Sequence, residues 1–362
     1  MSLVPINGDL TSGETASGET ASGETDVLWQ ASGDAQSIVA TDSEKADGNL
    51  PAGGPEEPIS EPADWFNRTI MLTAIIAPFL GFLAGIYYCW TIGWMGWPFL
   101  AMIVVAWCMS GMGVTIGFHR LLTHSSFETY KPLRAFWMMM GALSIEGSPL
   151  VWCAVHRKHH QRSDVLGDPH SPNLHGKGLW NAIRGFFYGH CGWLLTTHWS
   201  KPDLSRYVPD LLQDKFLVWV DRFYYLWVLI SFAMPAGIGV LIAWLSGDPL
   251  WKGALLGILW GGLVRVFMGH HITWSINSVC HMFGKRDYQT TDKSTNNLAC
   301  ALLGFGEGWH NNHHAFPTSA RHGLHWWQID TSWLAIYTMQ KLGLAWDIKV
   351  PSREIITAKQ IR

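Results

Sequence analysis

Long stretches without charged side chains dominate the middle of the chain. The 50 residues from 69 to 118 contain no Asp, Glu, Lys or Arg. As a single helix they would measure about 75 Å, far more than one crossing of a hydrocarbon core about 30 Å thick. Residues 90–98 hold three tryptophans, two glycines and a proline, as is typical of a turn at a membrane surface. The pattern therefore predicts two spans, 68–90 and 97–118, joined by a turn at 91–96.

A second pair of apolar runs follows. Residues 223–246 again lack charged side chains, a Gly-Asp-Pro sequence begins at Gly247, and a further apolar stretch covers about 252–276. We therefore expect an all-α membrane protein with four transmembrane helices in two hairpins. Arg265 interrupts the fourth span. A charge at that depth either faces the bundle interior or an aqueous cavity, or it extends along its aliphatic stem to the interface. The sequence leaves both alternatives open.

Basic residues predict how the spans are oriented. The loop 119–215 contains 11 Lys and Arg and the segment 281–362 contains nine, whereas the two short turns hold only Lys252. Since basic residues favour the cytoplasmic side, we expect both termini and the large loop to be cytoplasmic. Two Met- and Trp-rich stretches, 133–147 and 333–346, are too short to span and are predicted to form interfacial or cap helices.

The first 62 residues differ in composition from the rest. They are acidic and rich in Gly, Ser, Thr and Glu, with the repeat TSGETASGETASGET at 11–25. Because so few apolar residues cannot offset the entropy of ordering, we predict a disordered tail over 1–62, an integral membrane domain over 63–350 and a short C-terminal tail over 351–362. A net charge of −3 gives no reason to expect nucleic acid as a partner. The six cysteines form no C-x-x-C pair, which argues against a zinc ribbon, an iron–sulfur site and a disulfide framework.

Eight of the 17 histidines fall in three short runs: HRLLTH at 119–124, HRKHH at 156–160 and HNNHH at 310–314. In H-x-x-H-H the three imidazoles share one face of a helix and can point into a common cavity. His119 and His124 are five residues apart, so they could bind together only at the end of a helix. Eight histidines exceed what one tetrahedral zinc needs and suit a pair of metals with nitrogen ligands, for which iron is a candidate. A His-rich metal transporter is the alternative from another class, but its ligands would lie near the middle of the spans.

Further motifs resemble the membrane-bound fatty acid desaturases. They are GFHRLLTH at 117–124, W-x₃-HRKHH at 152–160, GDPHSP at 167–172, RGFFYGHCGWLL at 184–195, TWSINSVCHMFG at 273–284 and GEGWHNNHHAFP at 306–317. The spacing of the histidine boxes is similar to the Δ9 acyl-CoA (stearoyl-CoA) desaturase branch, in a bacterial-type form without a fused cytochrome b5. The resemblance covers about residues 69–325.

This resemblance implies a di-iron centre in a cytoplasmic helical cap, with O₂ as co-substrate. The metal ligands it implies are nine histidines: His119, His124, His156, His159, His160, His281, His310, His313 and His314. Asn277 would contact a metal through a water. His170 is a candidate for contacting the metal ligands without binding the metal itself. Trp274 is a candidate for lining the substrate tunnel.

The implied reaction introduces a cis double bond, at Δ9, into a saturated acyl chain. Acyl-CoA is the favoured carrier and a lipid-linked chain the alternative. The family's Arg-Asp and Arg-Lys pairs that bind CoA are replaced here by Ala154 and Val155 and by Thr196 and Thr197. Arg157, Arg162, Lys177 and Arg184 lie in the same loop and could substitute for them.

The electron source and the reaction type leave further points open. No H-P-G-G or C-x-x-C motif is present in the sequence, so electrons are expected from a separate ferredoxin, rubredoxin or cytochrome b5-type protein. A fatty acid or alkane hydroxylase is the nearest alternative. The HRLLTH and NSVCH segments argue against it.

Overall fold

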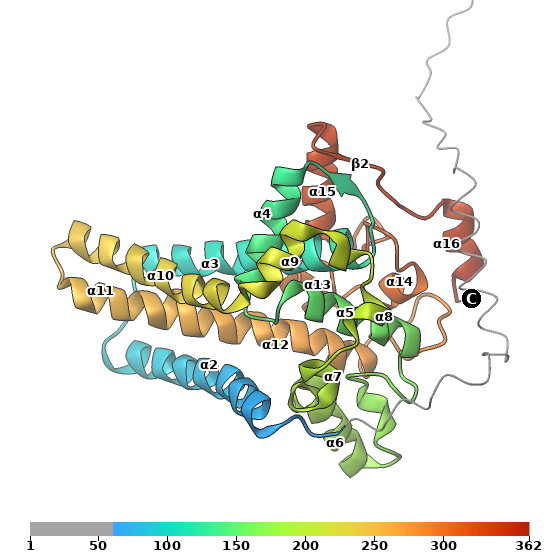
Figure 1. Ribbon diagram of the computed structural model, residues 1–362, viewed down its shortest axis with the longest axis horizontal. Helices are drawn as coiled ribbons and strands as arrows, with labels where there is room; N and C mark the ends of the chain where they lie inside the picture. Colours follow the sequence, from blue (N-terminus) through green and yellow to red (C-terminus); the bar gives the residue numbers. More distant parts are fainter. Residues whose placement is uncertain (1–60, 362) are drawn as a thin grey trace, which may run out of the picture. The chain divides into compact units, whose positions relative to one another are not determined.

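The structure, a computed structural model, describes residues 61–361. Residues 1–60 of the tail predicted to be disordered lie outside this range. The described residues are mainly helical (Figure 1), and the one sheet among them pairs two short antiparallel strands, β1 (Glu128–Thr129) and β2 (Ala345–Trp346). The predicted all-α fold class is confirmed.

Four helical segments within residues 61–361 are long and apolar enough to cross a membrane, judged by length and composition. They are α2 (Trp65–Thr91); α3 (Trp97–Met112) with its continuation, the π-helix η1 (Gly113–Thr123); α10 (Tyr224–Ser246); and α11 (Leu250–Gly257), which continues through the π-helix η5 (Ile258–Val264), α12 (Arg265–Ser278) and the 3₁₀ turn η6 (Val279–His281). The first and third agree closely with the predicted spans. The second and fourth extend further, to Thr123 and His281.

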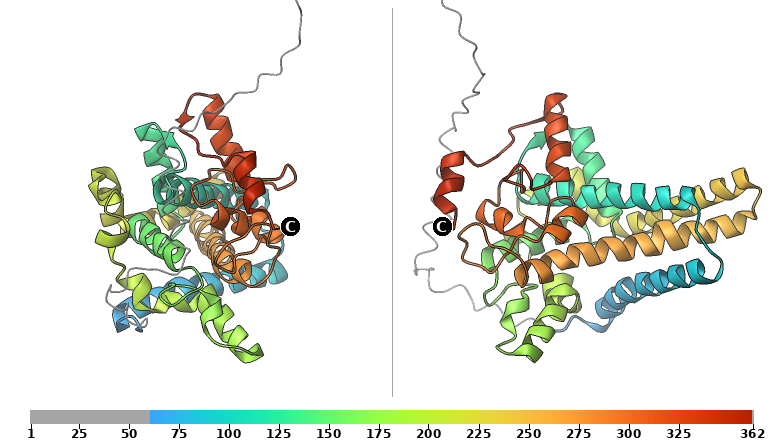
Figure 2. Two further views of the ribbon diagram at one scale, coloured as in Figure 1. Left: turned by 90° about the vertical axis from the view of Figure 1, so that its right-hand side faces the viewer. Right: turned by 180° about the vertical axis from the view of Figure 1, so that it is seen from behind.

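Shorter helices follow the second and the fourth span. They are α4 (Lys131–Ala142), α5 (Pro149–Arg162), η2 (Pro172–Leu174), α6 (Leu179–His190), η3 (Gly192–Leu195), α7 (Thr197–Ser200), α8 (Leu204–Tyr207), η4 (Leu211–Gln213), α9 (Lys215–Arg222), α13 (Leu298–Leu303), α14 (His310–Ala315), α15 (Thr331–Lys341) and α16 (Arg353–Lys359). Helices α4 and α15 confirm the two helices predicted outside the spans. Most of the short helices gather at one end of the long ones and form a cap there (Figures 1 and 2).

Glycine and proline set the turn of the second hairpin. Gly247 ends α10 in the left-handed conformation (φ 72°), which costs glycine little because it has no Cβ. The amide of Asp248 then donates to the carbonyl of Ala243 at 2.9 Å, and Pro249 precedes the first residue of α11. The two helices pack so closely that a Cβ at Gly239 would overlap the backbone of Gly253. Small residues at such a crossing are typical of helix pairs in membranes.

The first span packs across the fourth. Helix α2 lies mainly against η5 and α12, on the side of them away from α10 (Figure 1). At the contact, a Cβ on Gly81 would overlap the side chain of Leu263, and one on Gly85 would meet the ring of Trp260. The first hairpin therefore packs against the second hairpin through the fourth span.

Arg265 lies inside the helix bundle, with 3% of its surface exposed. Its guanidinium donates to the carbonyl of Leu143 at 2.8 Å, to the hydroxyl of Ser231 at 2.5 Å and to the hydroxyl of Ser110 at 3.4 Å. These oxygens replace the water that the cation loses on burial. Of the two alternatives for Arg265, the structure therefore shows the interior one.

The C-terminal residues return to the cap. Helix α16 lies within the segment predicted as a short tail, and the amide of Gln289 donates to the carbonyl of Lys359 at 2.9 Å. The ammonium of Lys359 donates to the carbonyl of Ala315, the last residue of α14, at 2.8 Å. Helix α16 thus contacts α14, the helix that contains the third histidine run.

Candidate metal centre

The first histidine pair lies at the C-terminal end of the π-helix η1, with His119 inside the helix and His124 as its C-cap. In a π-helix the hydrogen bonds run from residue i to i+5, and the amide of His124 donates to the carbonyl of His119 at 3.1 Å. The wider turn brings the fifth residue back toward the same face, so the two ring centroids are 4.9 Å apart. The sequence predicts a helix end at this pair, and η1 does end at Thr123. The sequence does not predict the π geometry.

Close packing fixes the position of η1. A Cβ on Gly117 would lie 2.7 Å from the carbonyl oxygen of Trp137 on α4. Only glycine permits this approach without a shift of one helix, because even a methyl group would contact backbone. The site helix is thereby held against α4 two residues before His119.

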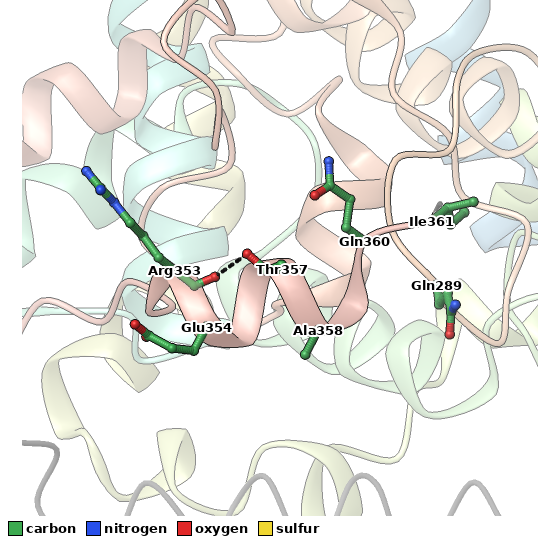
Figure 3. Close-up of a pocket in the computed structure, with 7 residues that line it drawn as sticks. All are labelled: Gln289, Arg353, Glu354, Thr357, Ala358, Gln360 and Ile361. Carbon is green, nitrogen blue, oxygen red and sulfur yellow. Dashed lines mark hydrogen bonds between the residues drawn. The ribbon is translucent and has the colours of Figure 1, made fainter.

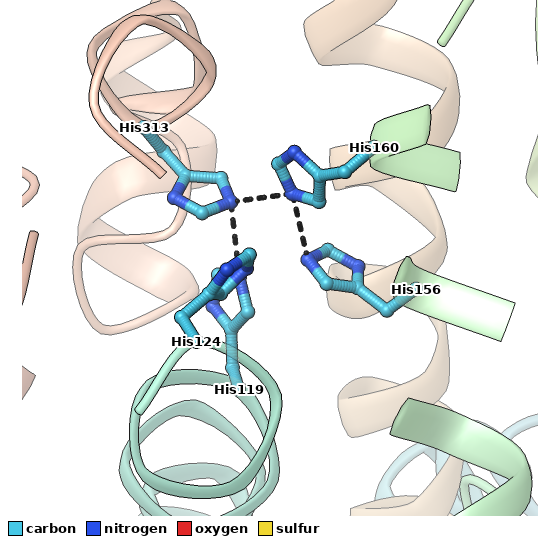
Figure 4. Close-up of side chains that lie close together, drawn as sticks. All are labelled: His119, His124, His156, His160 and His313. Atoms are coloured by element: carbon cyan, nitrogen blue, oxygen red, sulfur yellow. Dashed lines mark hydrogen bonds between the residues drawn. The ribbon is translucent and has the colours of Figure 1, made fainter. Parts of the chain in front are cut away.

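Helices α5 and α14 each carry an H-x-x-H-H triplet, and each triplet is divided between two neighbouring sites. Nitrogen atoms of His119, His124, His156, His160 and His313 lie within 4.8 Å of one another, and we call this group the five-histidine cluster (Figure 4). The same holds for His159, His281, His310 and His314, the four-histidine cluster. The prediction that the imidazoles of one triplet share a single cavity is therefore too simple. Residues i and i+3 of a triplet diverge far enough to face different sites.

In both clusters the Nε2 atoms point inward. In the five-histidine cluster the Nε2 of His313 lies 3.1 Å from that of His119 and 2.9 Å from that of His160, which lies 3.0 Å from that of His156 (Figure 4). In the four-histidine cluster the Nε2 of His310 lies 3.0 Å from that of His281 and 3.1 Å from that of His314. The rings of His160 and His314 stack with centroids 4.6 Å apart, so the clusters adjoin.

Four of the nine histidines contact a carboxylate through Nδ1, the ring nitrogen on the far side from Nε2. Sequence reasoning missed these carboxylates. The Nδ1–carboxylate distances are 2.6 Å for His119–Glu307, 3.0 Å for His159–Asp168, 2.8 Å for His281–Asp164 and 2.7 Å for His314–Asp292. Metal-binding histidines are typically oriented in this way, since a proton fixed on Nδ1 leaves the Nε2 lone pair free. These acidic residues lie in loops or beside the boxes, and no spacing rule connects them to their histidines.

The donor set fits a metal ion. If Nδ1 of His281 and of His314 donates to its carboxylate, both present Nε2 lone pairs to His310, which has only one Nε2 proton to offer. Nε2 of His124 and Nε2 of His159 are buried without any hydrogen-bond partner. A cation within each cluster would satisfy the converging lone pairs and the unpaired atoms together.

Electrostatics favour neutral imidazoles at most of these positions. Burial lowers the pKa of five histidines well below its usual range, and neighbouring imidazoles lower it further: His124, His156, His160, His310 and His313. Burial alone would lower the pKa of His159 too, but the Asp168 carboxylate raises it above its usual range. Neutral imidazole is the form that binds metals, so a proton competes with metal more strongly at His159 than at these five histidines.

Arg120, inside the first histidine box, holds the carboxylate behind His119. Its side chain is fully buried, and its guanidinium contacts Glu307 at 3.1 Å and Asp330 at 3.0 Å. The same group lies 3.2 Å from Nδ1 of His322, whose ring centroid is 4.6 Å from that of His313. His322, which the resemblance placed outside the ligand set, thus borders the five-histidine cluster.

The other site residues predicted from the sequence lie beside the clusters. His170 stacks on His159 with ring centroids 4.3 Å apart. Asn277 and the imidazoles of His119, His156 and His310 line a narrow cavity of about 60 Å³. Trp274 packs in a buried cluster with Trp193 and Trp199 instead of lining this cavity. The roles assigned to His170, Asn277 and Trp274 stay predictions.

A wider hollow of about 760 Å³ lies over α16, away from the histidines (Figure 3). It is lined by Gln289, Arg353, Glu354, Thr357, Ala358, Gln360 and Ile361. Among the described residues, its lining holds one carboxylate, Glu354, and no histidine. We assign this hollow no function.

Comparison with known proteins agrees with the site. A sequence model described as fatty acid desaturase matches residues 92–336, which include all nine histidines. The chain belongs to the fatty acid desaturase family. Membership makes the chain a membrane-bound oxidoreductase of lipid metabolism.

Three similar relatives from the desaturase family have names that state different acyl carriers. A hex-5-enoyl-[acyl-carrier protein] acetylenase of Moorena producens (strain JHB) is 39% identical over 72% of this chain and 80% of its own. An sn-1 stearoyl-lipid 9-desaturase of Anabaena variabilis is 37% identical over 76% and 93%. An acyl-CoA C20 Delta5-desaturase of Anemone leveillei is 41% identical over 66% and 70%. Family membership therefore does not fix the carrier of this desaturase.

Proposed function

We propose that this desaturase uses O₂ to introduce a cis double bond at Δ9 into a saturated acyl chain. The observation that carries the proposal is the pair of adjoining histidine clusters, which open onto a narrow cavity through His119, His156 and His310. An unactivated methylene loses hydrogen only to a strong oxidant. Such a site must therefore combine a metal centre with a cavity that holds one C–C bond beside it.

The nine histidines would hold two iron ions, one in each cluster. Bound iron would supply the oxidising power drawn from O₂. The protein orients the imidazoles through Glu307, Asp164, Asp168 and Asp292. Asn277 would reach the metal through a water from the cavity side.

We infer a lipid-linked acyl chain as the carrier, in place of the acyl-CoA that the sequence resemblance favours. Ala154 is completely buried and Val155 nearly so, so neither position faces a water-soluble ligand. Arg157 is not free to take over the binding of CoA phosphates. Its five N–H groups donate to the carbonyls of Leu122, Thr123 and Tyr207 and to both carboxylate oxygens of Asp210, at 2.6–3.1 Å.

Two relatives support this choice of carrier. The Anabaena variabilis protein and a second, 37% identical one from Synechocystis sp. are both named sn-1 stearoyl-lipid 9-desaturases. Purified enzyme with a reconstituted electron donor should desaturate a stearoyl phospholipid. Turnover of stearoyl-CoA alone would contradict this assignment and favour acyl-CoA as the carrier. The half-buried Arg162 and the exposed Lys177 and Arg184 would then be the candidates for binding CoA.

The electron donor would be a separate protein of the ferredoxin, rubredoxin or cytochrome b5 type, and the metal centre and both termini would be cytoplasmic. The decisive experiment is gas chromatography of total fatty acids after expression in a host that lacks unsaturated ones. We expect a cis Δ9 monounsaturated product, and none from His159→Ala. A hydroxylated product would favour the hydroxylase alternative and overturn the proposal.

A further inference from the structure

Two carboxyl groups, Glu146 and Glu307, line the cavity together with the histidines. Glu307 is paired with His119 and Arg120, whereas Glu146 forms no ion pair among the described residues. Glu146 belongs to the loop between α4 and α5, and it lines the same cavity as His119, His156 and His310. Its Oε1 accepts a hydrogen bond from the hydroxyl of Thr273 at 2.9 Å. The indole of Trp152 is also close to the carboxyl, but Oε2 is buried and receives no hydrogen bond of good geometry. A buried acidic oxygen without a well-formed hydrogen bond is costly and therefore points to a role beyond packing.

The loop is built to hold this side chain in place. Ile145 and Gly147 on either side adopt positive φ angles of 63° and 104°, and the first is unfavourable for a β-branched residue. The imidazole of His270 contacts the carbonyl of Ile145 at 2.9 Å, and the hydroxyl of Tyr224 accepts from the amide of Gly147 at 3.0 Å. Two different spans thus fix the strained backbone from both sides of Glu146.

Thr273 connects the carboxyl to the metal side of the cavity. Thr273 and Asn277 are four residues apart on α12, so they lie on one face about one turn from each other. Both line the cavity. Because a hydroxyl can donate and accept at once, Thr273 can pass a proton between Glu146 and a group beside Asn277.

The reaction needs such a path. Conversion of –CH₂–CH₂– to –CH=CH– releases two electrons and two protons, whereas reduction of O₂ to two waters takes four of each. The remaining two electrons come from the donor protein and the remaining two protons from solvent. A cavity that excludes bulk water must therefore contain a group that supplies protons.

We propose that Glu146 delivers these two protons, passing them along the Thr273 side of α12 to the region beside Asn277. The assignment of the reaction rests on the proposed function. A hydroxylation at the same centre, which also takes two electrons from the substrate and two from the donor, would have the same demand for two protons from solvent. Burial raises the pKa of Glu146 to about 7, so both protonation states are accessible at neutral pH. The other charged or titratable groups around it are Arg265 and His270 on α12, Tyr224 on α10, and the lining residues Glu307, His119, His156 and His310.

The test compares Glu146→Gln, Glu146→Asp and the matched control Asp221→Asn. Gln keeps the shape and can still accept from Thr273 but carries no exchangeable acid, whereas Asp keeps the acid on a shorter stem. Asp221 is a carboxylate next to the same loop, bonded to the amide of Leu150 at 2.9 Å and outside the cavity lining. Purified enzymes loaded with iron would be assayed across pH, with both alkene and alcohol products counted.

We expect Glu146→Gln to lower the total product rate at least about tenfold, in line with general acid catalysis, with Glu146→Asp retaining more activity than Gln. The wild-type rate should fall as pH rises through about 7, because the donor must be protonated, and this fall should vanish in Glu146→Gln and persist in Asp221→Asn. In metal-free protein, the infrared carbonyl band of a protonated acid should titrate near that pH and be missing in Glu146→Gln.

A wild-type rate and pH profile in Glu146→Gln would overturn the proposal. So would an order of activity with Gln above Asp, which indicates a packing role. If the wild type makes alcohol, the desaturase proposal fails, whereas the comparison between the Glu146 variants still decides the source of the protons.

Discussion

His313 illustrates what a single residue contributes to the centre. The Nε2 of His313 faces the Nε2 atoms of His119 and His160. Loss of this imidazole therefore removes one metal-ligating nitrogen and allows the two neighbouring rings to reorient. We predict that His313→Ala abolishes desaturation and lowers bound iron, measured by product analysis and by elemental analysis of purified protein. His325→Ala is the matched control, because that ring stacks on Trp327 outside both clusters. Full activity in His313→Ala would contradict its place among the ligands.

The orienting role of the carboxylates that contact the histidine Nδ1 atoms can be tested without changing the metal ligands. Asp292 lies 2.7 Å from Nδ1 of His314, and although burial raises the pKa of this carboxyl, the imidazole beside it holds the value far below its usual range. Asp292→Asn keeps the size but removes the charge that orients the ring. We expect iron affinity to fall about 10- to 100-fold, as for other groups that orient metal ligands. Asp248→Asn, in the turn after α10, should leave iron affinity unchanged, and equal affinities in the two variants would disprove the orienting role.

At the scale of single elements, the contact between η1 and α4 sets the position of the first histidine box. Gly117→Ala would place a methyl group 2.7 Å from the Trp137 carbonyl oxygen, a contact that backbone cannot easily relieve. Overpacking of this kind typically costs about 1–3 kcal/mol, so we expect a lower Tm in detergent and less bound iron. Gly237→Ala on α10 is the control, because nothing lies within 4 Å of the Cβ it would add. An unchanged Tm in Gly117→Ala would show that η1 can move without loss of stability.

The elements also show how far the sequence alone can be read. Two charge-free runs and a third apolar stretch, interrupted by Arg265, predict the four spans because lipid tolerates few charges. Helices α4 and α15 follow from shorter apolar stretches. The π-helix η1 is not predictable from apolar periodicity, since the residues of one continuous span fit an ordinary helix equally well. Consequently the pairing of His119 with His124 is expected only as a helix-end arrangement.

The division of the triplets and the supporting carboxylates lie beyond sequence reasoning for another reason. Which cluster His159 or His313 joins depends on how α5 and α14 are turned toward each other, a tertiary relation that local spacing does not contain. Asp164, Asp168 and Asp292 resemble ordinary loop acids in the sequence. Only the folded cap brings them within 3.0 Å of Nδ1 atoms.

For the whole molecule, the distribution of basic residues predicts the orientation in the membrane, and cysteine labelling tests this prediction directly. Single cysteines placed in the turns at 91–96 and 247–252, in a background without native cysteines, should react from outside intact cells with an impermeant thiol reagent. Cysteines at positions 30 and 205 should react only after the membrane is broken. The reverse pattern would place the histidine clusters on the outer face.

The central claim is that two adjoining histidine clusters form one two-metal oxidation centre. Its most direct test is the iron content of purified, catalytically competent protein, measured per polypeptide chain alongside product formation. The account predicts about two iron atoms per chain, with activity rising in step with the second. Full desaturase activity with one iron atom per chain, or with none, would contradict it.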